Sequence, residues 1–245
     1  MTRTVPGGFF FDYGGTLVEE ISFDVRAGNE WLLSRASYRP PNLAIDDVLT
    51  RARRIASEVA DRRDETHLET PWPALTKLIH DFLGVRFDLP SSELEIGFWK
   101  ASVNTQPMPG VRLALDRFRE WRIPLGVVSN TCFSEPVIRY ELGKHGLAQY
   151  LDVVMVSAEY AVRKPNPVLF EIAAAKLGKL ARSIWFVGDR LDTDIAGAKA
   201  AGMTAAWFNR SKAQDPARTA DYVFADWKEL VLHTSRLASA NINHA

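Results

Sequence analysis

Residues 9–17 of the chain read FFFDYGGTL, and their pattern is the strongest indication of the fold in the sequence. A short run of large apolar residues is typical of a strand that is buried on both faces of a sheet. The two glycines that follow allow the backbone to turn tightly, so the strand is predicted to end at Asp12. Ligands of open α/β sheets bind at the carboxyl ends of the parallel strands. Asp12 is therefore predicted to lie where a carboxylate can act as a nucleophile.

Three later segments have a similar pattern, in which a strand or loop ends in polar residues. They read LGVVSN at 125–130, RKPNP at 163–167 and IWFVGD at 184–189. In chain order these segments supply a hydroxyl (Ser129), an amide (Asn130), a lysine (Lys164) and a carboxylate (Asp189). Two more acids, Asp192 and Asp194, follow.

Taken in this order, the four segments resemble the motifs of the haloacid dehalogenase (HAD) superfamily, most of whose members are magnesium-dependent phosphatases. The resemblance runs from Phe9 to about Phe208. It implies an α/β fold with a Rossmann-like three-layer core, in which a parallel sheet lies between layers of helices, plus an inserted α-helical cap. It also implies a small phosphorylated metabolite as the substrate.

The pattern of the chain after Gly110 independently favours this fold class. Strand-like apolar runs alternate there with helix-like segments, and such alternation predicts a parallel sheet with helices on both faces. The predicted strands are 125–128, 153–156, 184–187, 204–208 and 222–224. The predicted helices are 111–121, 136–145, 167–177 and 194–201.

The stretch from 19 to 105 is rich in Arg, Glu, Ala and Leu and has few strand signals. Helices are predicted over 44–62 and 74–83, and QPMPG at 106–110 is predicted to be a rigid turn back into the core. We therefore expect a core domain formed by 1–18 and 106–245 and a helical cap domain formed by 19–105. At the position of the HAD cap, this insertion would close over the site and select the substrate. Residues 239–245 are predicted to be a short polar tail that frays.

The resemblance implies a Mg²⁺ site at the carboxyl edge of the sheet. Asp12 would be both nucleophile and metal ligand, and the backbone carbonyl of Gly14 and the carboxylate of Asp189 would complete the protein ligands. Magnesium prefers such oxygen ligands. Asp194 and Thr16 would support these groups from a second layer through hydrogen bonds.

The resemblance also implies a phosphate-binding group formed by Ser129, Asn130 and Lys164. The hydroxyl of Ser129 and nearby N–H groups would hold phosphoryl oxygens. Lys164 would also be catalytic, because it would neutralise charge on the nucleophile and on the transferring group.

Gly14 departs from the family pattern, because most phosphatases of the superfamily carry a second aspartate at this place. That aspartate acts as general acid and base, which contributes on the order of 10² to 10⁴ in rate. Three interpretations remain open. In the first, the protein is a phosphatase whose substrate has a good leaving group, or in which Glu19 or Glu20 replaces the missing aspartate. In the second, it catalyses another HAD reaction, as dehalogenases and phosphonate-cleaving enzymes do. In the third, it is a binding or regulatory protein with little turnover. The acids Asp189 and Asp194 favour a metal and count against dehalogenation.

The bulk properties narrow the possible partners. The 245 residues are 47% hydrophobic and 24% charged, which is typical of a globular protein. The formal net charge is +0 and the sequence has no long basic stripe, so nucleic acid is not an expected partner. Cys132 is the single cysteine, which excludes an internal disulfide and is typical of a reducing compartment. With no membrane-spanning apolar run and no apolar signal region in the sequence, we expect a cytoplasmic protein. No residue predicts the oligomeric state.

Overall fold

The computed structural model describes residues 5–215 and 217–242. Within these residues, six parallel strands form one sheet in the order β5-β4-β1-β6-β7-β8. The strands are β1 (Gly8–Phe11), β4 (Leu125–Ser129), β5 (Val153–Val156), β6 (Ile184–Gly188), β7 (Thr204–Phe208) and β8 (Tyr222–Phe224). Each strand predicted from the sequence is present, and the predicted α/β fold class is confirmed.

The three phenylalanines of β1 explain why this strand lies in the middle of the sheet. Successive side chains of a strand point to opposite faces. Phe9 and Phe11 enter one hydrophobic cluster and Phe10 enters another on the other face, and all three are fully buried. On the first face, the ring of Phe9 lies 4.5 Å from that of Phe118. A strand with large apolar side chains on both faces must be covered on both faces by other parts of the chain.

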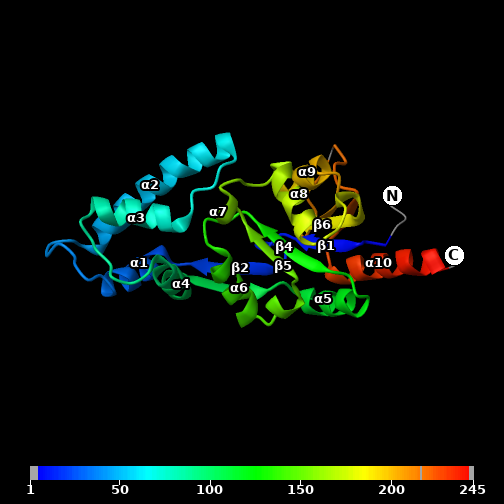
Figure 1. The fold of residues 1–245 in the computed structure, drawn as a ribbon, viewed down its shortest axis with the longest axis horizontal. Coiled ribbons are helices and arrows are strands. Elements are labelled where there is room, and N and C mark those ends of the chain that lie inside the picture. Colours follow the sequence, from blue (N-terminus) through cyan, green and yellow to red (C-terminus); the bar gives the residue numbers. More distant parts are fainter. Residues whose placement is uncertain (1–4, 216, 243–245) are drawn as a thin grey trace.

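Helices cover both faces of the sheet, as the alternating pattern predicts (Figure 1). The first cluster contains residues of α5 (Val111–Glu120), α6 (Glu135–Lys144) and α10 (Trp227–Ile242). The second contains residues of α8 (Pro167–Lys176) and α9 (Ala196–Ala200). Short turns of helix occur at α7 (Ser157–Tyr160), Ala148–Tyr150 and Ala181–Ser183, and a π-helical turn at Leu191–Ile195 precedes α9. Over the described stretches, every helix is too short or too polar to pass through a lipid bilayer.

An inserted segment from β2 to β3 separates β1 from the rest of the core. It comprises β2 (Val18–Phe23), α1 (Val25–Ser34), α2 (Ile45–Thr66), α3 (Trp72–Phe82), α4 (Ser91–Ser102) and β3 (Val103–Pro107). Helices α1–α3 lie at the end of the molecule that is remote from α5 and α10 (Figure 1). The two helices predicted in this region correspond to α2 and α3.

Two local predictions are wrong. The residues predicted as the start of a rigid turn, Gln106 and Pro107, belong to β3, which pairs antiparallel with β2 and carries the chain back from the helices. The predicted tail is helical as far as Ile242, because α10 continues through it, and the hydroxyl of Ser239 donates to the carbonyl of Ser235 one turn earlier. The last part of that predicted tail, 243–245, lies outside the described residues.

Candidate functional site

A cleft of about 690 Å³ lies at the carboxyl edge of the sheet, between the core and the inserted segment. The core contributes Asp12, Gly14, Ser129, Asn130, Lys164 and Asp194. The inserted segment contributes Glu20, Phe23, Arg63, His67, Trp99 and Val103. The cleft therefore brings together residues from all four sequence motifs and faces both charged and aromatic side chains of the insertion.

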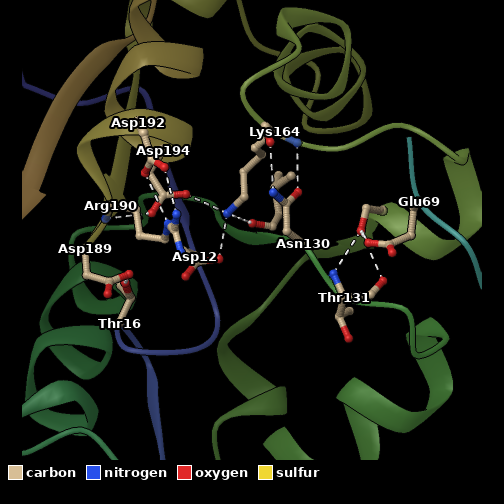
Figure 2. Close-up of polar contacts among 12 residues, drawn as sticks. Asp12, Thr16, Glu69, Asn130, Thr131, Lys164, Asp189, Arg190, Asp192 and Asp194 are labelled. Carbon is tan, nitrogen blue, oxygen red and sulfur yellow. Dashed lines mark hydrogen bonds and ion pairs between the residues drawn. The ribbon is translucent and has the colours of Figure 1, made fainter. Parts of the chain in front are cut away.

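Asp12 follows β1 directly and is held at the centre of this edge. Its backbone N–H donates to the carbonyl of Val187 in β6 (2.8 Å), and its side chain accepts a hydrogen bond from Lys164 Nζ (2.6 Å; Figure 2). The pKa of Asp12 is raised to about 7, because burial, reinforced by the charge of Asp194, outweighs the opposite effect of Lys164. Without a cation, this carboxylate is thus costly to ionise.

Lys164 is buried among three oxygen atoms: two accept hydrogen bonds from its Nζ, and the third, from Asp194, forms an ion pair with it. Its Nζ lies 2.6 Å from Asp12 Oδ1, 2.8 Å from the carbonyl oxygen of Val128 and 2.7 Å from Asp194 Oδ1. Burial opposes its charge, but the attraction of Asp12 and Asp194 outweighs burial and raises its pKa. Lys164 is therefore a fixed positive charge at the centre of the site.

The carboxylates of Asp12, Asp189 and Asp194 form a group suited to a divalent cation. They offer oxygen atoms that all lie within 4.8 Å of one another. Burial, and then the charge of Asp194, raises the pKa of Asp189. Three carboxylates and the ammonium of Lys164 sum to a charge of −2, which one Mg²⁺ would neutralise, and oxygen is the donor that Mg²⁺ prefers. The structure thus places Asp194, expected in the second layer, with the two predicted carboxylate ligands.

The turn after Asp12 brings the backbone against Asp189. Gly15 has φ +74°, and a Cβ there would lie 2.5 Å from Asp189 Oδ2. The hydroxyl of Thr16, which is fully buried, lies 3.5 Å from Asp189 Oδ1. Thr16 and Gly15 therefore border the carboxylate that was predicted as a metal ligand.

Ser129 and Asn130 are consecutive residues at the end of β4, but their side chains make different contacts. Ser129 is buried and lines the cleft. The amide of Asn130 is engaged with the backbone of Lys164: its Nδ2 donates to the carbonyl (2.9 Å), and its Oδ1 accepts from the N–H (2.8 Å; Figure 2). This reciprocal pair fixes the lysine segment, a role that sequence reasoning missed because the two residues are 34 positions apart.

The position of Gly14 differs from that of Gly15. Gly14 is exposed in the cleft, and its φ lies outside the left-handed range. Apart from residues 13–15 themselves, no atom of the described residues comes within 4 Å of a Cβ built there. Two acids could replace the missing aspartate. One of them, Glu19, is held by other residues, since it accepts hydrogen bonds from Gln106 (2.9 Å) and Arg210 (3.0 Å). Glu20 lines the cleft.

Other polar residues near the site were not among the predicted site residues. Asp192 forms an exposed ion pair with Arg190 (2.7 Å). A further group, centred on Glu69 of the inserted segment, lies beside Thr131 and the Lys164 segment (Figure 2). No spacing in the sequence indicates this group, because its members come from separate elements.

Comparison with known proteins agrees with this geometry. Residues 96–208 match the family described as haloacid dehalogenase-like hydrolase. The described fold also matches a crystal structure of a HAD phosphatase from Thermococcus onnurineus, with a TM-score of 0.61 and 27% identity over 91% of this chain and 95% of that one. These two matches support a hydrolase of the haloacid dehalogenase superfamily.

Its relatives within the HAD superfamily include different enzymes. The chain is 39% identical over 111 residues to the glyceraldehyde 3-phosphate phosphatase of Methanopyrus kandleri, covering 45% of this chain and 46% of that protein. It is 30% identical over 110 residues to (S)-2-haloacid dehalogenase 2 of Pseudomonas sp., covering 45% and 47%. The chain thus spans about half the length of the curated relatives it matches. Similarity to both kinds of enzyme leaves the reaction open, so the residues of the site must decide it.

Proposed function

We propose that the protein is a magnesium-dependent phosphatase that hydrolyses a small phosphorylated metabolite through an aspartyl-phosphate on Asp12. The observation that carries this proposal is the grouping of Asp12 with Asp189, Asp194 and Lys164, whose summed charge of −2 fits a divalent cation. A dehalogenase has no phosphoryl charge to neutralise, so a group suited to a divalent cation favours the phosphatase.

In the proposed reaction, one carboxylate oxygen of Asp12 attacks phosphorus, and the bond from phosphorus to the leaving oxygen breaks. Lys164, held by Asp12, Asp194 and the carbonyl of Val128, offsets negative charge on the transferring group. The hydroxyl of Ser129 would bind a phosphoryl oxygen. Water then attacks the phosphorus of the aspartyl-phosphate, which releases inorganic phosphate and restores the carboxylate of Asp12.

The proposed Mg²⁺ ligands are the carboxylates of Asp12 and Asp189 and the carbonyl of Gly14, with Asp194 beside them. When bound, the cation would screen the charge between the nucleophile and the phosphoryl oxygens. The high pKa of Asp12 is consistent with this proposal, because a cation would favour the ionised carboxylate that burial disfavours.

The substrate is proposed to carry a leaving group that departs with little help from an acid, such as an acyl or aryl phosphate, because Gly14 supplies no proton. The inserted segment would act as the cap that selects it. Phe23, Trp99 and Val103 give its side of the cleft an apolar part, and Arg63 and His67 give it a polar part. We expect this reaction in the cytoplasm.

The test is release of inorganic phosphate from a panel of phosphorylated metabolites and one acyl phosphate, with Mg²⁺ or with EDTA. Wild type would be compared with Asp12→Asn and with Asp81→Asn, a matched control whose exposed carboxylate pairs with Lys77 in α3. Release that needs both Mg²⁺ and Asp12, and that Asp81→Asn leaves intact, would support the proposal. Absence of release would contradict it, and halide release from haloacids would then identify a dehalogenase.

A further inference from the structure

Residues 67–72, which comprise the connection between α2 and α3 and the first residue of α3, run across the core loop that precedes Lys164. We call this connection the strap. Backbone contacts join it to the core: Glu69 N–H to the Ala161 carbonyl (3.0 Å), Arg163 N–H to the His67 carbonyl (2.9 Å), Trp72 N–H to the Cys132 carbonyl (2.7 Å) and an antiparallel bridge between Leu68 and Val162. The strap is thus the part of the insertion that touches the loop of the catalytic lysine.

The carboxylate of Glu69 lies beneath the strap, and its side chain is only 1% exposed. A carboxylate buried to this degree needs partners. Ser157 Oγ donates to it (2.6 Å), and the guanidinium of Arg163 forms an ion pair with it. The same Ser157 hydroxyl accepts the backbone N–H of Thr131 (2.8 Å; Figure 2).

Two of these partners, Arg163 and Thr131, connect Glu69 to Lys164 by separate paths. Arg163 immediately precedes Lys164. Thr131 immediately follows Asn130, whose amide binds both the N–H and the carbonyl of Lys164. The contacts close into a ring that contains the ends of β4 and of the Lys164 loop, so a shift of the Glu69 carboxylate would move the lysine from both directions.

We propose that Glu69 is a positioning residue through which the inserted segment holds Lys164 in place for phosphate. Lys164 has little freedom, since Nζ must lie between Asp12 and Asp194 at 2.6 and 2.7 Å. Misplacement of such a group by about 1 Å is enough to cost a large part of its effect. The consequence for phosphate rests on the proposed function, whereas the ring of contacts does not.

The experiment is a double-mutant cycle on phosphate binding, carried out with the full chain. Titration calorimetry would measure the affinity for inorganic phosphate in the presence of Mg²⁺ for wild type, Glu69→Gln, Lys164→Met and the double variant. Glu58→Gln is the matched control, because its exposed carboxylate also pairs with an arginine, Arg54, in the same inserted segment. Amide hydrogen exchange of residues 157–166 would be followed in the same proteins.

Glu69→Gln is expected to weaken phosphate binding about fivefold or more while Lys164 is present, and to have no further effect in the Lys164→Met background. It is also expected to speed exchange at 157–166, and Glu58→Gln to change neither quantity. An equal loss of affinity in both backgrounds would overturn the inference, because a merely structural defect does not depend on Lys164.

Two further outcomes separate this inference from the proposed function. If wild type binds no phosphate, the proposed function fails, and the inference about Glu69 is then tested by amide hydrogen exchange alone. In that case, unchanged exchange at 157–166 in Glu69→Gln overturns the inference. If Glu69→Gln does not fold, Ser157→Ala replaces it in the cycle, since that variant removes one side of the ring and keeps the ion pair between Glu69 and Arg163. The expected results are the same.

Discussion

At the scale of single residues, Gly14 offers a direct test of the missing acid. The cleft has room for a side chain at this position, as judged from all described residues. Gly14→Asp is therefore expected to fold and to speed phosphate release from esters with poor leaving groups by up to about 10² to 10⁴, the usual contribution of general acid–base catalysis. Steady-state rates on an alkyl and an aryl phosphate would measure the effect.

Gly14→Asn is the control for this variant, because it adds nearly the same volume without an ionisable group. It is expected to give no gain on either ester. If Gly14→Asp also gives none while its circular dichroism and melting temperature match wild type, another group already supplies the proton, and Glu20 in the cleft becomes the residue to replace.

Substitutions at Gly15 and at Gly14 provide a matched test of the contact between the backbone turn and the carboxylate of Asp189. Gly15→Ala places a methyl group 2.5 Å from Asp189 Oδ2 and forces alanine to adopt φ +74°. We expect it to weaken Mg²⁺ binding at least about tenfold and to lower the free energy of unfolding by about 1 kcal/mol or more. Gly14→Ala meets neither obstacle and is expected to leave both unchanged. Mg²⁺ titration and urea unfolding would measure these effects, and equal effects at the two positions would contradict the assigned contact.

At the scale of elements, the sequence predicts some parts well for a physical reason. The core strands are apolar runs buried on both faces, so their own composition identifies them. The pair β2–β3 is different: VEEISF and VNTQP are mixed and partly exposed, and each is a strand only because the other lies beside it. Such a pairing between segments far apart in the chain leaves no local signal.

The same distinction applies to the candidate site. Asp12 and Asp189 follow predicted strands, whereas Lys164 precedes a predicted helix and Asp194 begins one. Their meeting at one edge follows from parallel topology. The partners that hold them could not be predicted. The Asn130 amide and the Glu69 carboxylate reach Lys164 through side-chain directions and loop paths that only the folded chain determines.

Between α4 and α6, a buried carboxylate provides an element-scale test. Glu141 accepts hydrogen bonds from Trp99 Nε1 (2.9 Å), Lys144 Nζ (2.9 Å) and the hydroxyl of Thr105. Burial opposes its charge, but these bonds prevail and lower its pKa. Its contribution to stability is therefore present above its unfolded pKa, near 4.5, and is lost as the pH falls through the folded value.

Glu141→Gln is expected to lower the free energy of unfolding by about 1 to 3 kcal/mol at pH 7, with a smaller loss at pH 4. Urea unfolding at the two pH values would measure both losses. Glu120→Gln, an exposed carboxylate paired with Arg117 in α5, is the control and should change stability little. A loss that does not depend on pH would show that Glu141 contributes shape rather than charge.

At the scale of the whole molecule, the carboxylate group links stability to pH and to Mg²⁺. The pKa of Asp12 is raised from 3.8 to about 7, first by burial, so without metal the folded state holds a proton that the unfolded chain has lost. Stability from this group is present below pH 4 and falls as the pH rises to 7, by at most about 1.4 kcal/mol per pH unit. Asp12→Asn removes the titration. In EDTA, its free energy of unfolding minus that of wild type is therefore expected to increase from pH 4 to pH 7.

Magnesium should reverse the sign of this pH effect for wild type. Binding requires ionised carboxylates, so Mg²⁺ affinity, and the stabilisation it confers, is expected to grow from pH 6 to pH 8 in wild type and to be much smaller in Asp12→Asn. Urea unfolding at each pH, with EDTA and with Mg²⁺, measures both effects in one series. If Mg²⁺ stabilises both proteins equally at every pH, the ion binds away from Asp12, and the charge of the three carboxylates must be balanced within the folded chain itself.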